Sequence, residues 1–215
     1  MMDTWCRIFA SMASSKPSFT TLASFLHSAC QRRTVWSWYG AALLASGTMT
    51  GCDSATPNPD KVLVQDSFEP GNSAIADPQY FSTEQAYSWK HSIKLGQGLE
   101  FGTFYNGTWG SLGQHRLLRL RLWGWLKNPQ QRLAYLTVVA QRPSDTPGGP
   151  AVVKIRHQFN IYEVIRRYQQ WVPASFTVEL PADLQPTDEV AVYMWVPAGQ
   201  PDAVYIDDFS LEYLD

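Results

Sequence analysis

The stretch that decides the fold is RLLRLRLWGWLK at residues 116–127, in which leucine alternates with arginine or tryptophan. Successive side chains of a β-strand point to opposite faces, so residues two apart share a face. One face of this strand would carry Leu118, Leu120, Leu122 and Leu126. The other face would carry Arg119, Arg121, Trp123 and Trp125. The pattern predicts a strand with one face in a core and the other presenting guanidinium and indole groups.

Similar short runs of alternating residues recur from residue 61 to the end of the chain. They occupy residues 61–68, 87–95, 99–105, 133–141, 152–161, 175–180, 189–196 and 204–213. Turn-forming residues separate them, as in Glu69-Pro70-Gly71 and in residues 146–150. Residues 161–168 also fit a helical stripe and are predicted to be irregular or a short helix. Eight or nine short strands with polar turns predict an all-β, antiparallel β-sandwich or barrel.

The composition indicates a folded protein and excludes one class of partner. The 215 residues are 45% hydrophobic and 17% charged, which is the balance of a globular chain. A net charge of −2 lacks the basic footprint that binding to a phosphate backbone requires, so nucleic acid is not an expected partner. Residues 61–215 contain no Pro- or Gly-rich break long enough to separate two cores, so one domain is expected there.

Residues 1–51 differ from the rest of the chain in charge. They carry four basic side chains and one acidic one, a net +3, which leaves −5 for residues 52–215. Arg32 and Arg33 directly precede residues 34–52, where no side chain is charged. This arrangement is typical of a secretory signal peptide. Roughly thirty residues ahead of the signal are too many for an ordinary bacterial n-region, which indicates a translation start assigned too far upstream.

The end of the uncharged stretch, Met49-Thr50-Gly51-Cys52, resembles the lipobox of bacterial lipoproteins. The resemblance implies that the leader is cut before Cys52 and that the thiol of Cys52 becomes lipidated. Each methylene of an acyl chain that is buried in a bilayer adds about 0.8 kcal/mol to the free energy of membrane binding. Residues 52–60 would then form a short tether, and the protein would be anchored in the bacterial cell envelope, on its periplasmic or cell-surface side. The alternative is a general secretory signal with an incidental cysteine.

The order of the strands resembles the jelly-roll carbohydrate-binding modules of the galactose-binding-like superfamily over most of residues 62–215. The resemblance rests on DSFE at 66–69, AYSWKHSIKL at 86–95, LWGWLK at 122–127, residues 171–181 and VYIDDFSL at 204–211. It implies a jelly-roll sandwich with a function in carbohydrate binding.

The resemblance also implies a structural calcium ion between the first strand and the last. The matching residues are Asp66, Glu69 and Asp207. Calcium prefers carboxylate and carbonyl oxygens and needs no fixed geometry. The alternative is that Asp207 and its neighbour Asp208 cap a turn or pair with a nearby arginine.

No catalytic constellation is visible, so neither a catalytic residue nor a catalytic cofactor is expected. His91 and His157 are isolated in the sequence, and the chain has no H-E-x-x-H. Cys52 is the last cysteine, so residues 53–215 cannot use thiol chemistry or thiolate metal ligands. Folding can bring any two carboxylates together, so a glycoside-cleaving enzyme stays as the least favoured function.

Aromatic side chains fit a ligand-binding role best. Sugars present flat C–H faces that stack on aromatic rings, while their hydroxyls bond to polar side chains. The candidate residues are Arg119, Arg121, Trp123, Trp125, Tyr193 and Trp195. If their strands share one concave sheet, they form an aromatic platform edged by guanidinium groups. The alternative is burial of tryptophans between the sheets, which is expected for Trp171.

The first functional hypothesis is a lipid-anchored envelope protein whose sandwich binds a polysaccharide or other glycan without cleaving it. The second is a structural or assembly lipoprotein whose sandwich docks on another envelope protein. A solvent-facing aromatic row with polar neighbours favours the glycan, and a flat apolar patch favours the protein partner. Burial of all six tryptophans of residues 52–215 would count against sugar binding.

Overall fold

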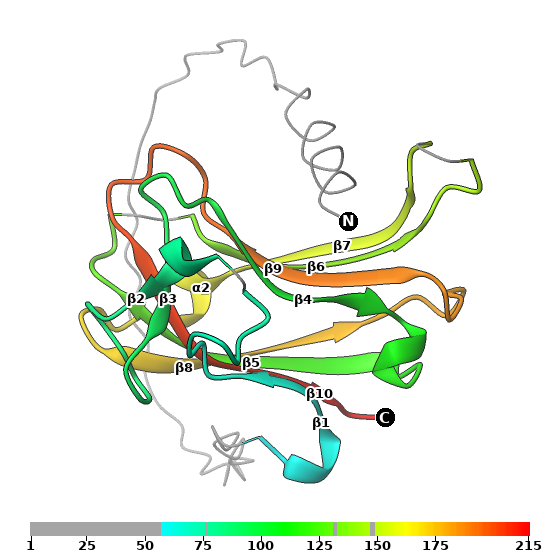
Figure 1. Cartoon of the computed structure of the whole chain (residues 1–215), viewed down its shortest axis with the longest axis horizontal. Coiled ribbons are helices and arrows are strands. Elements are labelled where there is room, and N and C mark those ends of the chain that lie inside the picture. The colour runs from blue at the N-terminus through cyan, green and yellow to red at the C-terminus, as the bar shows by residue number, and fades with distance from the viewer. Residues whose placement is uncertain (1–56, 76, 131–132, 147–148) are drawn as a thin grey trace, which may run out of the picture. The chain divides into compact units, whose positions relative to one another are not determined.

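Two antiparallel sheets pack against each other in a computed structural model that describes residues 57–75, 77–130, 133–146 and 149–215 (Figure 1). The larger sheet has the order β2-β3-β10-β5-β8, with β1 also paired to β10. Its strands are β1 (Val62–Asp66), β2 (Phe81–Ser82), β3 (Ser92–Leu95), β5 (Leu117–Leu126), β8 (Trp171–Glu179) and β10 (Val204–Tyr213). The smaller sheet, β4-β9-β6-β7, consists of β4 (Phe101–Thr108), β6 (Tyr135–Arg142), β7 (Val152–Asn160) and β9 (Glu189–Trp195). The predicted all-β, antiparallel sandwich is confirmed, with ten strands among the described residues.

The core lies between the two sheets and follows the alternation of the sequence. Leu118, Leu120 and Leu122 of β5 are fully or almost fully buried, as are Val192 and Met194 of β9. Full burial of such a side chain stabilises the fold by about 1.5–3 kcal/mol. Aromatic rings join the layers, because the ring of Phe104 in β4 lies 5.1 Å from that of Phe209 in β10. The even-numbered leucines of β5 therefore face the other sheet, as predicted.

Short helical segments connect some of these strands. They are η1 (Pro59–Lys61), η2 (Pro78–Tyr80), η3 (Gly110–Leu112) and α2 (Ile161–Val164). The α2 turn falls within residues 161–168, where the sequence predicts a short helix or irregular structure, and the side chain of Asn160 accepts a hydrogen bond from Tyr162 N at its start. Among the described residues, no helix is long and apolar enough to cross a membrane. The predicted leader and Cys52 lie outside the described residues.

The strand prediction was wrong at residues 87–91, which form a loop before β3. Their N–H groups bond to carboxylates from distant parts of the chain instead of to a strand ladder. Tyr87 N donates to Asp207 Oδ2 at 2.8 Å, and His91 N donates to Glu69 Oε1 at 2.9 Å. A loop that satisfies its N–H groups in this way needs no sheet partner, although its sequence alternates.

A β-bulge interrupts β10 in the middle of the larger sheet. The register with β5 shifts between Asp207, opposite Trp123, and Ser210, opposite Arg121. Within the bulge Asp208 adopts a left-handed conformation with φ of 47°. Before the bulge, residues 204–206 of β10 pair with β3. After it, residues 209–212 of β10 pair with β1. The bulge also turns the outer side chains of β10 relative to those of β5.

Candidate functional site

The structure places the six candidate binding residues on two different sheets. Arg119, Arg121, Trp123 and Trp125 project from the outer face of β5, in the six-stranded sheet. Tyr193 and Trp195 project from the outer face of β9, in the four-stranded sheet. The single platform expected from the sequence does not form, because β5 pairs with β10 and β8 whereas β9 pairs with β4 and β6. Figure 1 shows the two sheets on opposite sides of the sandwich, so side chains on their outer faces point away from each other.

Three aromatic rings form a row across the outer face of the four-stranded sheet. Phe101 of β4, Trp195 of β9 and Tyr135 of β6 are register neighbours. The rings of Phe101 and Trp195 have centroids 6.2 Å apart at 13°, and those of Trp195 and Tyr135 are 5.6 Å apart at 23°. Each of the three is partly exposed, and none belongs to the core between the sheets. The row is therefore available to a partner from outside the domain.

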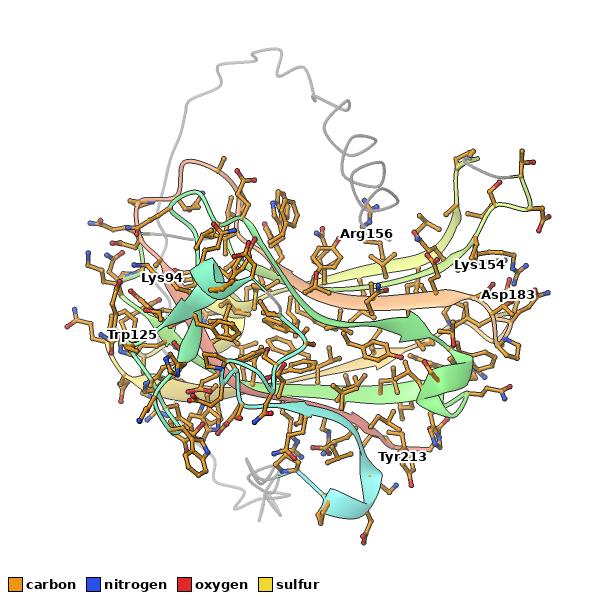
Figure 2. All side chains as sticks on the ribbon, in the orientation of Figure 1. Lys94, Trp125, Lys154, Arg156, Asp183 and Tyr213 are labelled. Atoms are coloured by element: carbon orange, nitrogen blue, oxygen red, sulfur yellow. The ribbon has the colours of Figure 1, made fainter. Side chains whose placement is uncertain are left out.

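Polar side chains lie in the rows beside these rings. Gln158 of β7 lies next to Thr137 of β6, which in turn lies next to Tyr193 of β9. Figure 2 shows Arg156 projecting from β7 away from the other sheet, and its charge acts on Tyr193. Burial raises the pKa of Tyr193 above its ordinary value. We call this surface the β9 face and define it by Phe101, Tyr135, Arg156, Gln158, Tyr193 and Trp195.

The aromatic residues of β5 are engaged in contacts on the opposite surface. The Trp123 ring stacks on Tyr87 from the loop before β3, with centroids 3.8 Å apart at 16°. Trp125 meets Tyr205 edge to face at 5.4 Å. Trp171, which was expected in the core, lies partly buried on this outer surface, and its ring centroid is 6.1 Å from that of Tyr87 at 60°.

The two arginines of β5 do not edge an aromatic platform. Arg121 Nε lies 3.0 Å from Glu212 Oε1 of β10, and both side chains are buried. Arg119 is the register neighbour of Glu212 on the same surface. Removing one partner of a buried ion pair strongly destabilises the folded protein, because the other charge stays buried without a partner. Arg121 therefore has a structural role in joining β5 to β10.

The three carboxylates expected to bind calcium each organise a loop. Asp66 accepts hydrogen bonds from Phe68 N at 2.7 Å and Ala74 N at 2.8 Å. Glu69 Oε2 lies 2.6 Å from His91 Nδ1. Although partial desolvation acts to raise it, the pKa of Glu69 is held below its usual range by the hydrogen bonds from His91 and from two backbone N–H groups. Both carboxylates therefore have partners within the protein.

Asp207 is the most buried of the three, with no exposed surface. Its carboxylate accepts backbone hydrogen bonds from Tyr87, Ser88 and Asp208. Burial raises the pKa of Asp207 to about 6. In the described part of the chain, no group of three His, Cys, Asp or Glu side chains is placed to hold a metal. Calcium also binds backbone carbonyl oxygens, which a group of side chains does not include. The calcium site therefore stays a prediction.

Sequence reasoning missed Phe101 and Tyr135, which complete the row around Trp195. Both occupy outward positions of alternating strands, so the signal was present in the period-two pattern. The sequence did not show that β4, β9 and β6 are neighbours, and without that order the three rings cannot be grouped. Of the described tryptophans only Trp109 is buried, and Trp89 is 84% exposed, so the condition set against sugar binding is not met.

Comparisons with known proteins give structural neighbours only. No protein-family model and no curated protein sequence matches the chain. The chain is similar to the CBM22-1 xylan-binding domain of Paenibacillus barcinonensis Xyn10C, with 15% identity and a TM-score of 0.43 over 72% of this chain and 96% of that one. It is also similar to the CBM22-1-CBM22-2 tandem domain of the same protein, with 14% identity and a TM-score of 0.46 over 72% of this chain and 50% of that one.

A third neighbour is the C-terminal family 22 carbohydrate binding module of Clostridium thermocellum Xyn10B. It shares 11% identity and a TM-score of 0.40 over 73% of this chain and 97% of that one. Similarities at this level carry no conclusion about the ligand of this chain, which rests on its own residues.

Proposed function

We propose that the β9 face binds a polysaccharide and does not cleave it. The observation that carries the proposal is the row of Phe101, Trp195 and Tyr135, three partly exposed rings on adjacent strands with polar side chains beside them. Aromatic rings pack against the C–H faces of sugars, and the neighbouring polar groups bond to sugar hydroxyls. A row that crosses three strands suits an extended chain of sugar units better than a single ring.

The replacement Trp195→Ala removes the central ring of the row and tests the proposal. We expect at least about tenfold weaker binding to the polysaccharides that the wild-type chain retains on a glycan array, because a central aromatic anchor supplies much of the binding energy. Trp125→Ala is the matched control, since Trp125 is also a half-buried outer tryptophan but lies on the other sheet (Figure 2). Thermal melting of the full chain in mild detergent verifies that both variants fold.

Two results would contradict this function. Equal loss of binding in the two variants would show that the β9 face is not the site. No binding to any glycan, together with capture of a single envelope protein, would favour the assembly role considered from the sequence.

We propose further that Cys52 anchors the domain in a bacterial envelope membrane through a lipid. The lipobox-like sequence before Cys52 supports this proposal. The full chain expressed in a bacterium with labelled palmitate should incorporate the label, and Cys52→Ser should not. Export of an unlabelled mature protein would instead support a general secretory signal.

A further inference from the structure

A pocket of about 400 Å³ opens on the outer face of the six-stranded sheet, on the side opposite the β9 face. This volume lies within the range of about 300–1,000 Å³ that is usual for small-molecule sites. One row of side chains that crosses four paired strands lies along it: Gln65 of β1, Ser210 of β10, Arg121 of β5 and Ser175 of β8. The pocket thus contains amide, hydroxyl and guanidinium groups at spacings fixed by the sheet register.

Ser210 is the residue in this row that points to a ligand. Its side chain is 1% exposed, and its Oγ has no hydrogen-bond partner among the described residues. Folded proteins rarely leave a buried hydroxyl unpaired, because its desolvation is then uncompensated. Gln65 and Arg121, its neighbours across the strands, line the same pocket. A ligand hydroxyl in the pocket would give Ser210 its missing partner.

The aromatic wall of the pocket is the stacked pair of Tyr87 and Trp123. The loop that carries Tyr87 is held in place, because Tyr87 N and Ser88 N donate to Asp207 Oδ2 at 2.8 and 3.0 Å. Ser88 Oγ also donates to Asp208 Oδ1 at 2.8 Å. The wall is therefore set in position without a ligand, which lowers the entropy cost of binding one.

Charges around the pocket favour an uncharged ligand. The guanidinium of Arg121 is balanced by Glu212, which lies 3.0 Å away in a buried pair. The Asp208 carboxylate also lines the pocket. A carboxylate accepts hydrogen bonds from hydroxyl groups and repels phosphate, sulfate or uronate groups.

We propose that this pocket is a second binding site, which takes an uncharged polyhydroxylated ring such as a single saccharide unit. One C–H face of the ring packs on the wall of Tyr87 and Trp123. Its hydroxyls bond to Ser210, Gln65 and Asp208. The site does not depend on the β9 face, because the two surfaces share no residue and lie on opposite sheets.

The proposal is tested by calorimetric titration of the full chain with five uncharged probes: glucose, galactose, xylose, N-acetylglucosamine and myo-inositol. We expect saturable binding of at least one of these probes, and none of glucose 6-phosphate. Ser210→Ala should weaken the binding about fivefold, the effect of one lost hydrogen bond. Its melting temperature should be equal to that of the wild type or slightly higher, because the variant loses no hydrogen bond within the protein and no longer buries an unpaired hydroxyl. Trp123→Ala should weaken it at least about tenfold.

Thr177→Ala is the matched control for the serine variant, because Thr177 is an exposed hydroxyl residue on the same surface of β8 and does not line the pocket. Binding of the sugars should be unchanged in Thr177→Ala. The proposal is overturned if no uncharged probe binds, if Ser210→Ala binds as tightly as Thr177→Ala, or if Trp195→Ala abolishes the binding. The last result would assign the sugars to the β9 face, so the two proposals fail separately.

Discussion

Asp188 is a fully buried carboxylate that ties the start of β9 to the end of β6. Its oxygens accept hydrogen bonds from Arg142 Nε and Nη2, both at 2.9 Å, and from Gln185 N at 2.8 Å. Asp188→Asn should destabilise the domain by about 2 kcal/mol. The neutral asparagine amide cannot form an ion pair with Arg142, so the charge of the Arg142 guanidinium is left without a counter-charge. Chemical denaturation measures this loss. Asp183→Asn is the control: the Asp183 carboxylate is 64% exposed in its pair with Lys154, and its loss should have no measurable effect.

The Asp188 carboxylate should also make the stability of the domain depend on pH. Hydrogen bonds from Arg142 hold the pKa of Asp188 below its ordinary value of 3.8, with burial acting in the opposite direction. A lowered folded-state pKa gives stability that is present above the unfolded value and is lost as the pH falls through the folded value. The difference in melting temperature between wild type and Asp188→Asn should be largest near pH 6 and shrink below about pH 4. A constant difference down to pH 3 would contradict the assignment.

The packing of β5 against the α2 segment depends on a glycine. A Cβ at Gly124 would collide with Cδ1 of Ile165, the fully buried residue that follows α2. Gly124→Ala should therefore cost about 1–3 kcal/mol, because the surrounding core leaves Ile165 little room to move. Ile165→Val removes the colliding methyl group, so it should recover most of that loss in the double variant. Denaturation of the four proteins in this cycle measures the coupling, and purely additive effects would contradict it.

Strand bounds could be predicted where alternating runs are long, even across the bulge of β10. Residues 116–127 and 204–213 were predicted as strands and match β5 and β10 within one residue at each end, because their apolar positions face a single core. Residues 87–91 alternate equally well but form a loop, since Asp207 and Glu69 supply the acceptors for their N–H groups. Those two acidic residues are distant in the sequence, so a local pattern cannot reveal the bonds.

The order of strands across the molecule explains why the candidate site was only partly predicted. The sequence correctly predicted that these residues face outward. Tyr193 and Trp195 lie on the β9 face. Arg121 and Trp123 line the pocket on the other sheet. Alternation shows that a residue faces outward, but it does not show which sheet the residue belongs to. That assignment depends on pairings such as β4 with β9, which join residues about ninety positions apart. The sequence therefore predicted one platform where the molecule has two separate surfaces.

The first and last strands of the domain pair with each other, and the predicted calcium ion would act at this junction. Asp66 ends β1, and Asp207 lies in β10 with its carboxylate buried and its pKa raised by desolvation. A cation bound to a buried carboxylate offsets that desolvation and stabilises only the folded chain. EDTA should therefore lower the melting temperature by about 3 °C or more, and added calcium should restore it. Asp207→Asn should remove this response, whereas Asp188→Asn should keep it. A melting temperature that EDTA does not change would show that the backbone N–H groups alone stabilise these carboxylates.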